Sequence, residues 1–531
     1  MTTPADTRNV VLTGFMGTGK TTVGRVLADQ LGFEFVDTDA IIESRHGPIK
    51  TIFSERGEEE FRAIERDLAE ELAEHSRLVI ATGGRMMLDP ANVASLSRNG
   101  RVFCLVATPE VILERVTADK ARAERPLLSV PDPHQRIVEL LGERDPEYRR
   151  FAQLTTDAQS PETIAGDIAT LARSDPKRFA IDTPTGDYHF SVGAALLPFV
   201  RQLAGIDGEL VVVTDAETAD LYLASCSTPD TFIVLPSGPG RRKSLDQVTY
   251  VYDALLEARV DRSATIMSLG DSIVGDIAAF AAATYLRGVD LVHCPTDLIA
   301  MIDTSVGGKV GLDTRHGRNL IGLYKQPSAV IADVATLQTL DARHFSAGMA
   351  EVLKHGLIAD SDLLDQLEAG EWSSAGRELP GALGDMQSLV AQAVQVKIAI
   401  VQADPFESGQ REFLNLGHTF AHAFEQVDTD GLIHGEAVAI GIIAAARLSA
   451  AVDSLSAENV TRIERLIDRL GLPSVLPRRL DLHAVIEAMT RDKKRRHGRQ
   501  RFVLLRDIGD PFVTDDVPEC TVREILESIQ P

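Results

Sequence analysis

The chain has 531 residues and a formal charge of −24, with 44% hydrophobic and 5% aromatic residues. This length exceeds what one ordinary hydrophobic core supports, so two or three domains are expected. The acidic balance argues against nucleic acid or an anionic membrane as a partner, because both repel a negatively charged protein. Small anionic substrates remain compatible, because they require only a local cluster of cations.

The start of the chain, MTTPADTRNV, lacks the basic residues and the apolar run of a signal peptide. No apolar stretch approaches the ~20 residues needed to span a bilayer. The four cysteines are widely scattered, without disulfide or metal-site spacing, and are expected to be buried in a reducing compartment. The sequence therefore predicts a cytoplasmic protein.

The first third of the chain alternates short β-rich runs with helical patterns. Strands are predicted at residues 9–13, 34–36, 78–81 and 102–106, with a helix that follows the first glycine-rich turn and ends near residue 30. This alternation predicts an α/β domain over residues 1–172, a parallel sheet with helices on both faces. The polar segment 173–180, which contains Pro176, is predicted to be a linker.

A second α/β segment follows. Strands are predicted at 210–214, 231–235 and 264–269, and the last leads into Gly270. From about residue 336 the strand signals nearly vanish and helical periodicity takes over, as in the alanine-rich stretch 437–451. The sequence thus predicts an α/β half over 181–335 and a helical half over 336–531, with one active site between the halves.

Residues 14–21, GFMGTGKT, match the phosphate-binding motif G-x-x-x-x-G-K-[ST] between the first predicted strand and helix. The glycines let backbone N–H groups wrap around phosphates, and the helix N-terminus favours negative charge. The lysine is expected to reach the β- and γ-phosphates, and the following threonine to hold Mg²⁺. The predicted contacts to ATP with Mg²⁺ are Gly14, Gly17, Gly19, Lys20, Thr21 and Thr22.

Several polar residues near this loop are candidates for the phosphoryl acceptor site. Asp37 and Asp39 follow a strand, so one carboxylate is expected to order Mg²⁺ water and the other to hold an acceptor hydroxyl. Taken singly, each candidate is more typical of a solvated charge or a cap. The remaining candidates are Arg62 with Glu65 on the same helix face, the pair Gly83 and Gly84 after a strand, and the cations Arg125 and Arg144.

Together and in this order, these residues resemble shikimate kinase over about residues 8–172. The resemblance implies a nucleoside-monophosphate-kinase-like fold and ATP-dependent phosphorylation of the shikimate 3-hydroxyl. It places Asp39 at the shikimate hydroxyls and Arg125 in a lid that stabilises the transferring charge. It implies a substrate pocket lined by Arg62, Gly83, Gly84 and Arg144. Where the family has a third glycine, this chain has Arg85, whose side chain either obstructs the acceptor or adds a cation for its carboxylate.

Histidines and a glutamate in the helical half suggest a metal site. Two imidazoles and one carboxylate leave a fourth position open, as a catalytic zinc requires. His418 and His422 lie four residues apart, hence on one helix face, so spacing alone nominates that pair, with Glu351 and His434 as further candidates. A lone histidine in a helical region is more often structural, and the neighbouring Lys354, Arg411 and Asn415 shift the balance toward a site.

These stretches resemble 3-dehydroquinate synthase over about residues 180–520. The matching motifs are PTDLIAMIDTSVGGKVG, RNLIG, AGMAEVLKHGLI, REFLNLGHTFAHAFE and HGEAVAIG. The resemblance implies zinc (or cobalt) held by Glu351, His418 and His434, with His422 in hydrogen bonding or proton transfer. It also implies NAD⁺, a homodimer formed through this half, and conversion of 3-deoxy-D-arabino-heptulosonate 7-phosphate to 3-dehydroquinate with release of phosphate.

The substrate of that reaction carries a phosphate and a carboxylate, so a dense cationic site is expected. The resemblance directs Lys309, Asn319, Lys354 and Arg287 (from this subunit or a partner subunit) to the phosphate, and Lys397, Arg411 and Asn415 to the carboxylate. Asp303 is expected to order Lys309 or a substrate hydroxyl, and Lys493 or Lys494 to reach the substrate from a basic loop. The expected NAD⁺ contacts are Asp215, Lys243, Gly270, Asp271, Ser272 and Asp276.

Two departures from the family pattern bear on these expectations. A triple glycine under the NAD⁺ pyrophosphate is replaced by Gly270, Asp271 and Ser272, and a carboxylate there is unfavourable unless it points away or caps the next helix. Arg318 stands where the family has lysine.

The leading interpretation is a bifunctional enzyme of aromatic amino-acid biosynthesis. The alternatives are a kinase fused to a related sugar-phosphate cyclase of secondary metabolism, or to an impaired synthase half that serves as a dimerisation scaffold.

Overall fold

The computed structural model describes residues 8–118, 131–148, 151–157, 159–236, 242–370, 372, 383–407, 409–428, 431–478, 480–490 and 500–531. The chain divides into two compact units, Met1–Pro176 with Phe199–Asp207, and Lys177–Pro198 with Gly208–Pro531. The predicted linker 173–180 contains the end of one helix and most of one strand.

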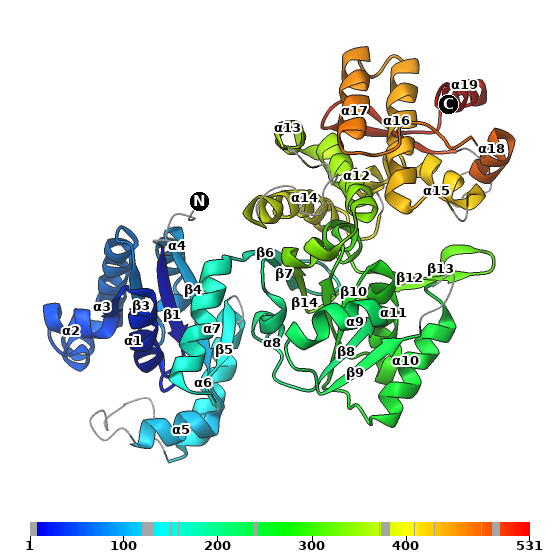
Figure 1. Ribbon diagram of the computed structural model, residues 1–531. Helices are drawn as coiled ribbons and strands as arrows, with labels where there is room; N and C mark the ends of the chain where they lie inside the picture. The colour runs from blue at the N-terminus through cyan, green and yellow to red at the C-terminus, as the bar shows by residue number, and fades with distance from the viewer. Residues whose placement is uncertain are drawn as a thin grey trace. The chain divides into compact units, whose positions relative to one another are not determined.

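The first unit is built on a five-stranded parallel sheet of order β2-β3-β1-β4-β5. The four predicted strands are confirmed, and a fifth strand at one edge was not predicted. Helices cover both faces of the sheet (Figure 1). Two apolar clusters, one with Val11 and Ile80 and one with Cys104, lie along the same face, because these residues are in register on neighbouring strands. The strands are β1 (Asn9–Gly14), β2 (Glu34–Asp37), β3 (Leu78–Ala81), β4 (Gly100–Val106) and β5 (Ala152–Thr155). The helices are α1 (Lys20–Leu31), α2 (Thr38–His46), α3 (Ile49–Ala73), α4 (Pro90–Arg98), α5 (Pro109–Ala118), α6 (Pro133–Tyr148), α7 (Pro161–Ser174) and α8 (Val200–Ala204).

The second unit begins with a seven-stranded sheet of order β6-β7-β14-β11-β10-β8-β9, parallel except at the β6–β7 edge. Its strands are β6 (Lys177–Ile181), β7 (Tyr188–Gly193), β8 (Leu210–Asp215), β9 (Thr231–Leu235), β10 (Thr265–Gly270), β11 (Asp290–Pro295) and β14 (Ala329–Asp333). The helices α9 (Ala216–Tyr222), α10 (Leu245–Glu257) and α11 (Ser272–Thr284) pack with this sheet. An antiparallel hairpin, β12 (Lys309–Thr314) with β13 (Gly317–Tyr324), follows a π-helical turn, η7 (Ala300–Thr304).

The remainder of the second unit is mainly helical, as expected. Its helices are α12 (Ala342–Ala359), α13 (Ser361–Ala369), α14 (Leu383–Ala403), α15 (His418–Val427), α16 (His434–Ala451), α17 (Ala457–Arg469), α18 (Leu482–Thr490) and α19 (Glu519–Ser528). A second hairpin, β15 (Phe502–Asp507) with β16 (Asp510–Thr514), lies among them (Figure 1). The expectation of almost no strands beyond residue 336 is wrong at this hairpin. The fold class, a P-loop α/β domain followed by an α/β half and a helical half, is confirmed.

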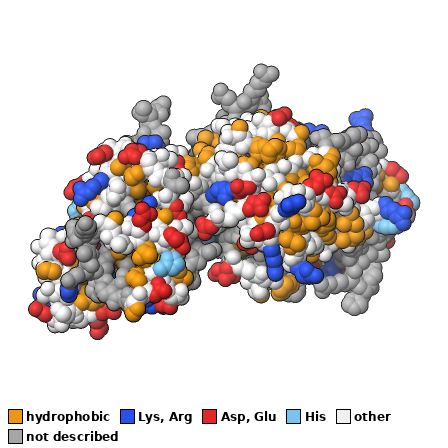
Figure 2. Space-filling model, turned by 90° about the horizontal axis from the view of Figure 1, so that it is seen from below, with side chains coloured by type: hydrophobic (Ala, Val, Ile, Leu, Met, Phe, Trp, Pro, Cys, Tyr) orange, Lys and Arg blue, Asp and Glu red, His pale blue; other side chains and the backbone are white. Residues whose placement is uncertain are grey.

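Surface and burial bear on two further expectations. Cys104, Cys226 and Cys294 are buried as expected, but Cys520 is exposed. On the face shown in Figure 2, acidic and basic side chains are interspersed among the described residues. Among the helices that the structure describes, none has the length and apolarity required to cross a membrane.

Candidate active sites

The phosphate-binding loop joins β1 to α1 through three glycines with positive φ. Gly14, Gly17 and Gly19 have φ of 130°, 80° and 92°, a region that other residues adopt only with strain. A Cβ on Gly14 would lie 2.2 Å from the carbonyl oxygen of Leu105, so a side chain there would displace β4. The loop geometry therefore requires glycine.

Lys20 and Thr21 start α1 directly after this loop. The Lys20 ammonium donates hydrogen bonds to the carbonyls of Gly14 (2.8 Å) and Phe15 (2.9 Å), which places a cation over the loop. The Thr21 hydroxyl donates to Oδ2 of Asp37 at 3.0 Å. A hydroxyl from the first turn of α1 and a carboxylate at the end of β2 thus meet, and hard oxygen ligands of this type suit Mg²⁺. Thr22, also predicted, is exposed.

Asp39 lies against the backbone of Gly83. A Cβ on Gly83 would be 2.5 Å from Oδ1 of Asp39, so only glycine permits this approach. The Gly83 N–H donates to the hydroxyl of the buried Thr38 at 2.9 Å, which fixes the end of β3 against α2. The structure thereby brings together the two predicted elements, the carboxylate after β2 and the glycine turn after β3.

Arg62 is held by two carboxylates of its own helix. Its guanidinium contacts Glu65 at 2.6 Å and Glu58 at 2.9 Å, and Glu65 is almost fully buried. Burial raises the pKa of Glu65, although the charge of Arg62 opposes the change. Arg85, the residue in place of the family's third glycine, also pairs with Glu58, at 3.1 Å. Its side chain is therefore held by Glu58, a residue that the sequence did not single out although it lies one helical turn before Arg62.

Arg144 is buried under the loop, with its guanidinium 5.0 Å from the ring centre of Phe15. One turn further along α6, the Tyr148 hydroxyl donates to the carbonyl of Gly84 at 2.8 Å. Burial raises the pKa of Tyr148 to about 12, so this hydroxyl keeps its proton. Tyr148 was not predicted from the sequence. Arg125 lies outside the residues that the structure describes.

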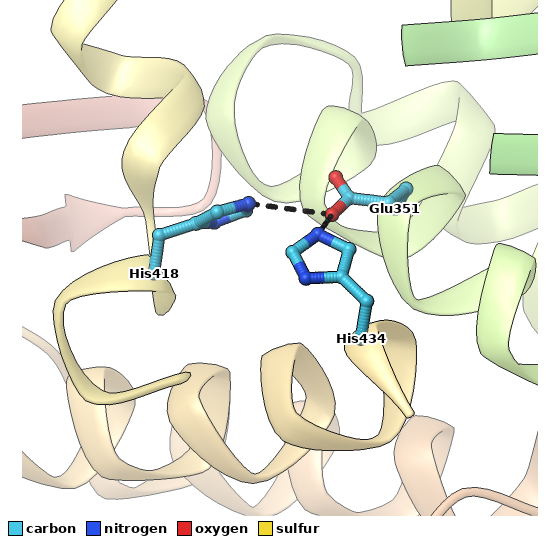
Figure 3. Close-up of side chains that lie close together, drawn as sticks. All are labelled: Glu351, His418 and His434. Carbon is cyan, nitrogen blue, oxygen red and sulfur yellow. Dashed lines mark ion pairs between the residues drawn. The ribbon is translucent and has the colours of Figure 1, made fainter. Parts of the chain in front are cut away.

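In the second unit, Glu351, His418 and His434 converge from α12, α15 and α16 (Figure 3). Each Nε2 lies 3.4 Å from Oε1 of Glu351, and the three ligand atoms are within 4.8 Å of one another. Glu351 is fully buried, and neither carboxylate oxygen accepts a hydrogen bond of regular geometry. Buried oxygens that face two imidazole nitrogens fit a divalent cation.

The other nitrogen of each of these imidazoles faces an acceptor. His418 Nδ1 donates to the carbonyl of Leu416 at 3.1 Å, and His434 Nδ1 lies 3.4 Å from Oε1 of Glu425. With a cation bound between the imidazoles and Glu351, protons on Nδ1 would leave both Nε2 lone pairs for the metal. Burial alone would lower the pKa of His434, but Glu351 and Glu425 raise it to about 10. Burial alone would raise the pKa of Glu425, but His434 and Arg318 lower it to about 2.

Two buried lysines lie beside this cluster. Lys354 forms an ion pair with Glu351, and Lys397 contacts Oδ1 of Asp303 at 2.5 Å. Burial lowers the pKa of Lys397 to about 8, although Asp303 opposes the change. Asp303, Glu351 and the buried His355 also lie within 4.8 Å of one another, by one ligand atom each. His355 was not predicted from the sequence. Burial lowers its pKa to about 3, so its imidazole is neutral.

The other predicted substrate residues divide between buried and exposed positions. Arg411 is buried and donates to the carbonyls of Pro405 (2.6 Å) and Gly307 (3.0 Å). Lys309 forms an ion pair with Glu407, and the Asn415 amide donates to the same carboxylate at 3.4 Å. Glu407 therefore links the predicted phosphate and carboxylate sides, which the sequence did not reveal.

Two predicted residues, Arg287 and His422, are less closely tied to this cluster. Arg287 is exposed in a turn with φ of 69°, directly after Leu286 with φ of 48°. His422 is exposed, and its ring centre lies 5.6 Å from that of His418. Lys493 and Lys494 fall outside the described residues.

A pocket beside the N-terminus of α11 contains the predicted dinucleotide residues Gly270, Asp271, Ser272 and Asp276. A Cβ on Gly270 would lie 2.7 Å from Val274. Asp271 accepts hydrogen bonds from the N–H groups of Ile273 and Val274, at 3.0 Å each. The carboxylate therefore caps α11, which is one of the two arrangements that the sequence left open.

Charged and polar pairs lie in and beside this pocket. Lys243 contacts Asp276 at 2.5 Å and Asn319 at 2.7 Å, so Asn319 of β13 belongs to the same network. On the floor, Ser268 and His293 from adjacent strands are 2.7 Å apart, a pair that the sequence did not suggest. Asp215 caps α9 by accepting from Thr218 N–H at 3.0 Å.

Comparison with known proteins follows the same division of the chain. Residues 16–172 match the family model for shikimate kinase, 233–347 the model for the 3-dehydroquinate synthase N-terminal domain, and 348–495 that for its C-terminal domain. A 3-dehydroquinate synthase from Nostoc punctiforme is 42% identical over 319 residues, 60% of this chain and 85% of the relative. The chain belongs to the 3-dehydroquinate synthase family. It carries a shikimate kinase domain in front of the synthase, and both are enzymes of the shikimate pathway.

Two further relatives place the synthase within its superfamily. A 3-dehydroquinate synthase from Synechococcus is 43% identical over 329 residues, 60% of this chain and 89% of the relative. A solved structure of 2-epi-5-epi-valiolone synthase from Streptomyces hygroscopicus, with NAD⁺ and Zn²⁺ bound, is 28% identical with a TM-score of 0.59, over 66% of this chain and 98% of that one. The fold is thus shared with another cyclase, while the greater sequence identity is to 3-dehydroquinate synthases.

Proposed function

We propose that residues 1–172 transfer the γ-phosphoryl group of ATP to the 3-hydroxyl of shikimate. We further propose that residues 181–531 convert 3-deoxy-D-arabino-heptulosonate 7-phosphate to 3-dehydroquinate with release of phosphate. The observation that carries the synthase assignment is the buried Glu351, with both ligand histidines turned toward it, beside Lys354 and Lys397. The kinase assignment depends on Asp39 seated against the glycine turn.

In the kinase, bound Mg²⁺ would neutralise charge on the transferring phosphoryl group. Thr21 and Asp37 would hold it, because their oxygens already meet at 3.0 Å. Lys20 would exchange its two loop carbonyls for phosphate oxygens. Asp39 would accept a hydrogen bond from the acceptor hydroxyl and orient it, while Arg62 and Arg144 would bind the acceptor carboxylate. Arg125 is proposed to act from the lid.

In the synthase, Glu351, His418 and His434 would hold Zn²⁺ (or Co²⁺), which polarises a carbonyl or hydroxyl oxygen when bound. NAD⁺ would lie at the Gly270–Ser272 turn with Asp215, Lys243 and Asp276, and it supplies a hydride acceptor when bound. The valiolone synthase with both groups bound supports this assignment. We infer that the cofactors enter the same unit of this chain.

The cations of this unit would then position the substrate. Lys397, with its pKa lowered to about 8, is suited to moving a proton near neutral pH and is held on Asp303. Arg411 and Asn415 would bind the carboxylate. Lys354, Lys309 and Asn319 would bind the phosphate, with Arg287 supplied by a second subunit of a homodimer, and His422 and Lys494 would complete the site. We also propose a cytoplasmic location.

A cyclase of secondary metabolism is the second candidate, since the valiolone synthase shares the fold. Identity of 38–43% to several 3-dehydroquinate synthases, against 28% to that cyclase, favours the first assignment. The buried cations Lys397 and Arg411 also suit a carboxylated substrate. The scaffold alternative is disfavoured because the metal ligands remain assembled.

The decisive assay offers the purified chain the carboxylated seven-carbon phosphate with NAD⁺ and Zn²⁺ and measures phosphate release. A separate assay offers ATP and shikimate. Lys20→Ala is expected to abolish only the second activity and His434→Ala only the first. No phosphate release at any NAD⁺ concentration would refute the synthase assignment, and loss of both activities in either variant would refute independent sites.

A further inference from the structure

The carboxylate of Glu425 lies between a proposed metal ligand and an exposed cation. Its Oε1 is 3.4 Å from Nδ1 of His434 and 2.6 Å from Nη1 of Arg318. The Glu425 side chain is 9% exposed, whereas that of Arg318 is 66% exposed. A largely buried carboxylate therefore has two charged or chargeable neighbours, on different elements, α16 and β13.

The two histidines of the metal cluster are oriented by different acceptors. His418 Nδ1 donates to the Leu416 carbonyl within the same segment, which is a fixed backbone contact. His434 Nδ1 has instead the side chain of Glu425, contributed by α15. A carboxylate behind a ligand imidazole fixes its tautomer and raises its basicity, and its loss typically weakens metal binding about 10- to 100-fold.

Arg318 connects this carboxylate to the dinucleotide pocket. It precedes Asn319 on β13, and Asn319 accepts from Lys243, which also contacts Asp276 of α11. The hairpin thus contacts Glu425 with one residue and, with the next, Lys243, which holds the pocket residue Asp276. Asn319 has a positive φ of 52°, and with this backbone conformation the two neighbouring residues make both contacts at once.

We propose that Glu425 is a positioning residue that orients His434 for the metal ion, and that Arg318 holds Glu425 in place from the hairpin. The inference rests on the proposed function, because it presumes that Glu351, His418 and His434 bind a divalent cation. It adds two residues that the sequence did not identify as parts of the metal site, and it gives the arginine at position 318 a specific contact.

The test measures metal affinity directly on the full chain. Zn²⁺ is titrated against a chromophoric chelator, and the visible spectrum of the Co²⁺-loaded protein reports the geometry at the metal. Glu425→Gln, which keeps the shape but removes the charge, is expected to weaken Zn²⁺ binding about tenfold or more and to alter the Co²⁺ spectrum. Arg318→Met is expected to weaken Zn²⁺ binding by a smaller factor. Arg318→Lys, which keeps a cation at this position, is expected to retain most of the Zn²⁺ affinity of the parent protein.

Glu436 offers a matched control. It lies on α16 two residues after His434 and pairs with Arg343 at 2.6 Å, the same distance as between Arg318 and Glu425. Glu436→Gln should leave both the Zn²⁺ affinity and the Co²⁺ spectrum unchanged. If Glu425→Gln matches the parent in both measurements, or if Glu436→Gln lowers affinity equally, the inference is overturned. If the parent protein itself binds no stoichiometric zinc, the proposed metal site fails first.

Discussion

Replacing Gly83 by alanine adds one methyl group at the point where Asp39 meets the backbone. The new Cβ would be 2.5 Å from Oδ1 of Asp39, whereas ordinary contacts begin near 3.4 Å. Relief requires the carboxylate to retreat by most of an ångström, or the backbone to give up the 2.9 Å hydrogen bond from Gly83 to Thr38. A misplacement of about 1 Å at a reacting group can cost ~100-fold in rate, or about 2.7 kcal/mol of transition-state stabilisation.

We therefore expect kcat/KM for shikimate to fall about 100-fold in Gly83→Ala, measured by coupled detection of ADP. KM for ATP should change by less than about threefold, because the P-loop is untouched. Gly166→Ala in α7 is the control, since its Cβ would find no atom within 4 Å and it lies outside the proposed shikimate pocket, and it should retain activity within about fivefold. An unchanged KM for ATP in each variant reports that the kinase unit folds. Parent-like kinetics in Gly83→Ala, or equal damage in both variants, would refute this reasoning.

Three further predictions concern the synthase. Asp271→Asn preserves an N-cap but removes a negative charge beside the proposed pyrophosphate position, so NAD⁺ should bind about 3- to 10-fold more tightly in a fluorescence titration; unchanged binding would contradict this. Burial raises the pKa of Asp297 to about 6, above its unfolded value, so the native state favours the protonated form and stability is lost as pH rises through 6. Asp297→Asn should therefore stabilise the protein by up to about 3 kcal/mol at pH 8 but only about 1.6 kcal/mol at pH 5, seen as a larger rise in melting temperature at pH 8. An equal gain at both pH values would argue against it. After the protein is treated with a chelator, desalted and supplied with Mg²⁺ alone, phosphate release by the synthase should be abolished, whereas shikimate phosphorylation should be retained. Added Zn²⁺ should restore the synthase activity. Loss of the kinase activity under these conditions would disprove separate metal requirements.

The positions with strong local constraints were predictable from the sequence. The residue type and spacing of Gly14, Gly17 and Gly19 predict a phosphate-binding loop, and all three have positive φ in the structure. The predicted metal residues Glu351, His418 and His434 are brought together from three helices, although spacing alone had favoured His422. In both cases few residue types can do the task, glycine for positive φ and histidine or a carboxylate for binding a metal ion. The sequence pattern alone therefore identifies the candidates.

Contacts between charged residues far apart in the chain were not predictable. Glu407 and Glu425 look like ordinary surface carboxylates in a chain with 78 acidic residues. Only the fold places one on Lys309 and the other behind His434. The hairpin of β15 and β16 was missed for a related reason, because short strands within a helical region are specified by pairing with each other rather than by a long local periodicity.

The π-helical turn η7 has a consequence for which sequence changes this chain can tolerate. It holds Asp303 so that both its side chain and its carbonyl oxygen accept from Lys397. A π turn contains one residue more than an α-helical turn, so the direction of Asp303 depends on the number of residues before it. Deleting one residue from Ala300–Ile302 would turn Asp303 by about 100° around the helix axis, away from Lys397. Substitutions at these apolar positions preserve that direction, so in this stretch length is more strictly constrained than identity.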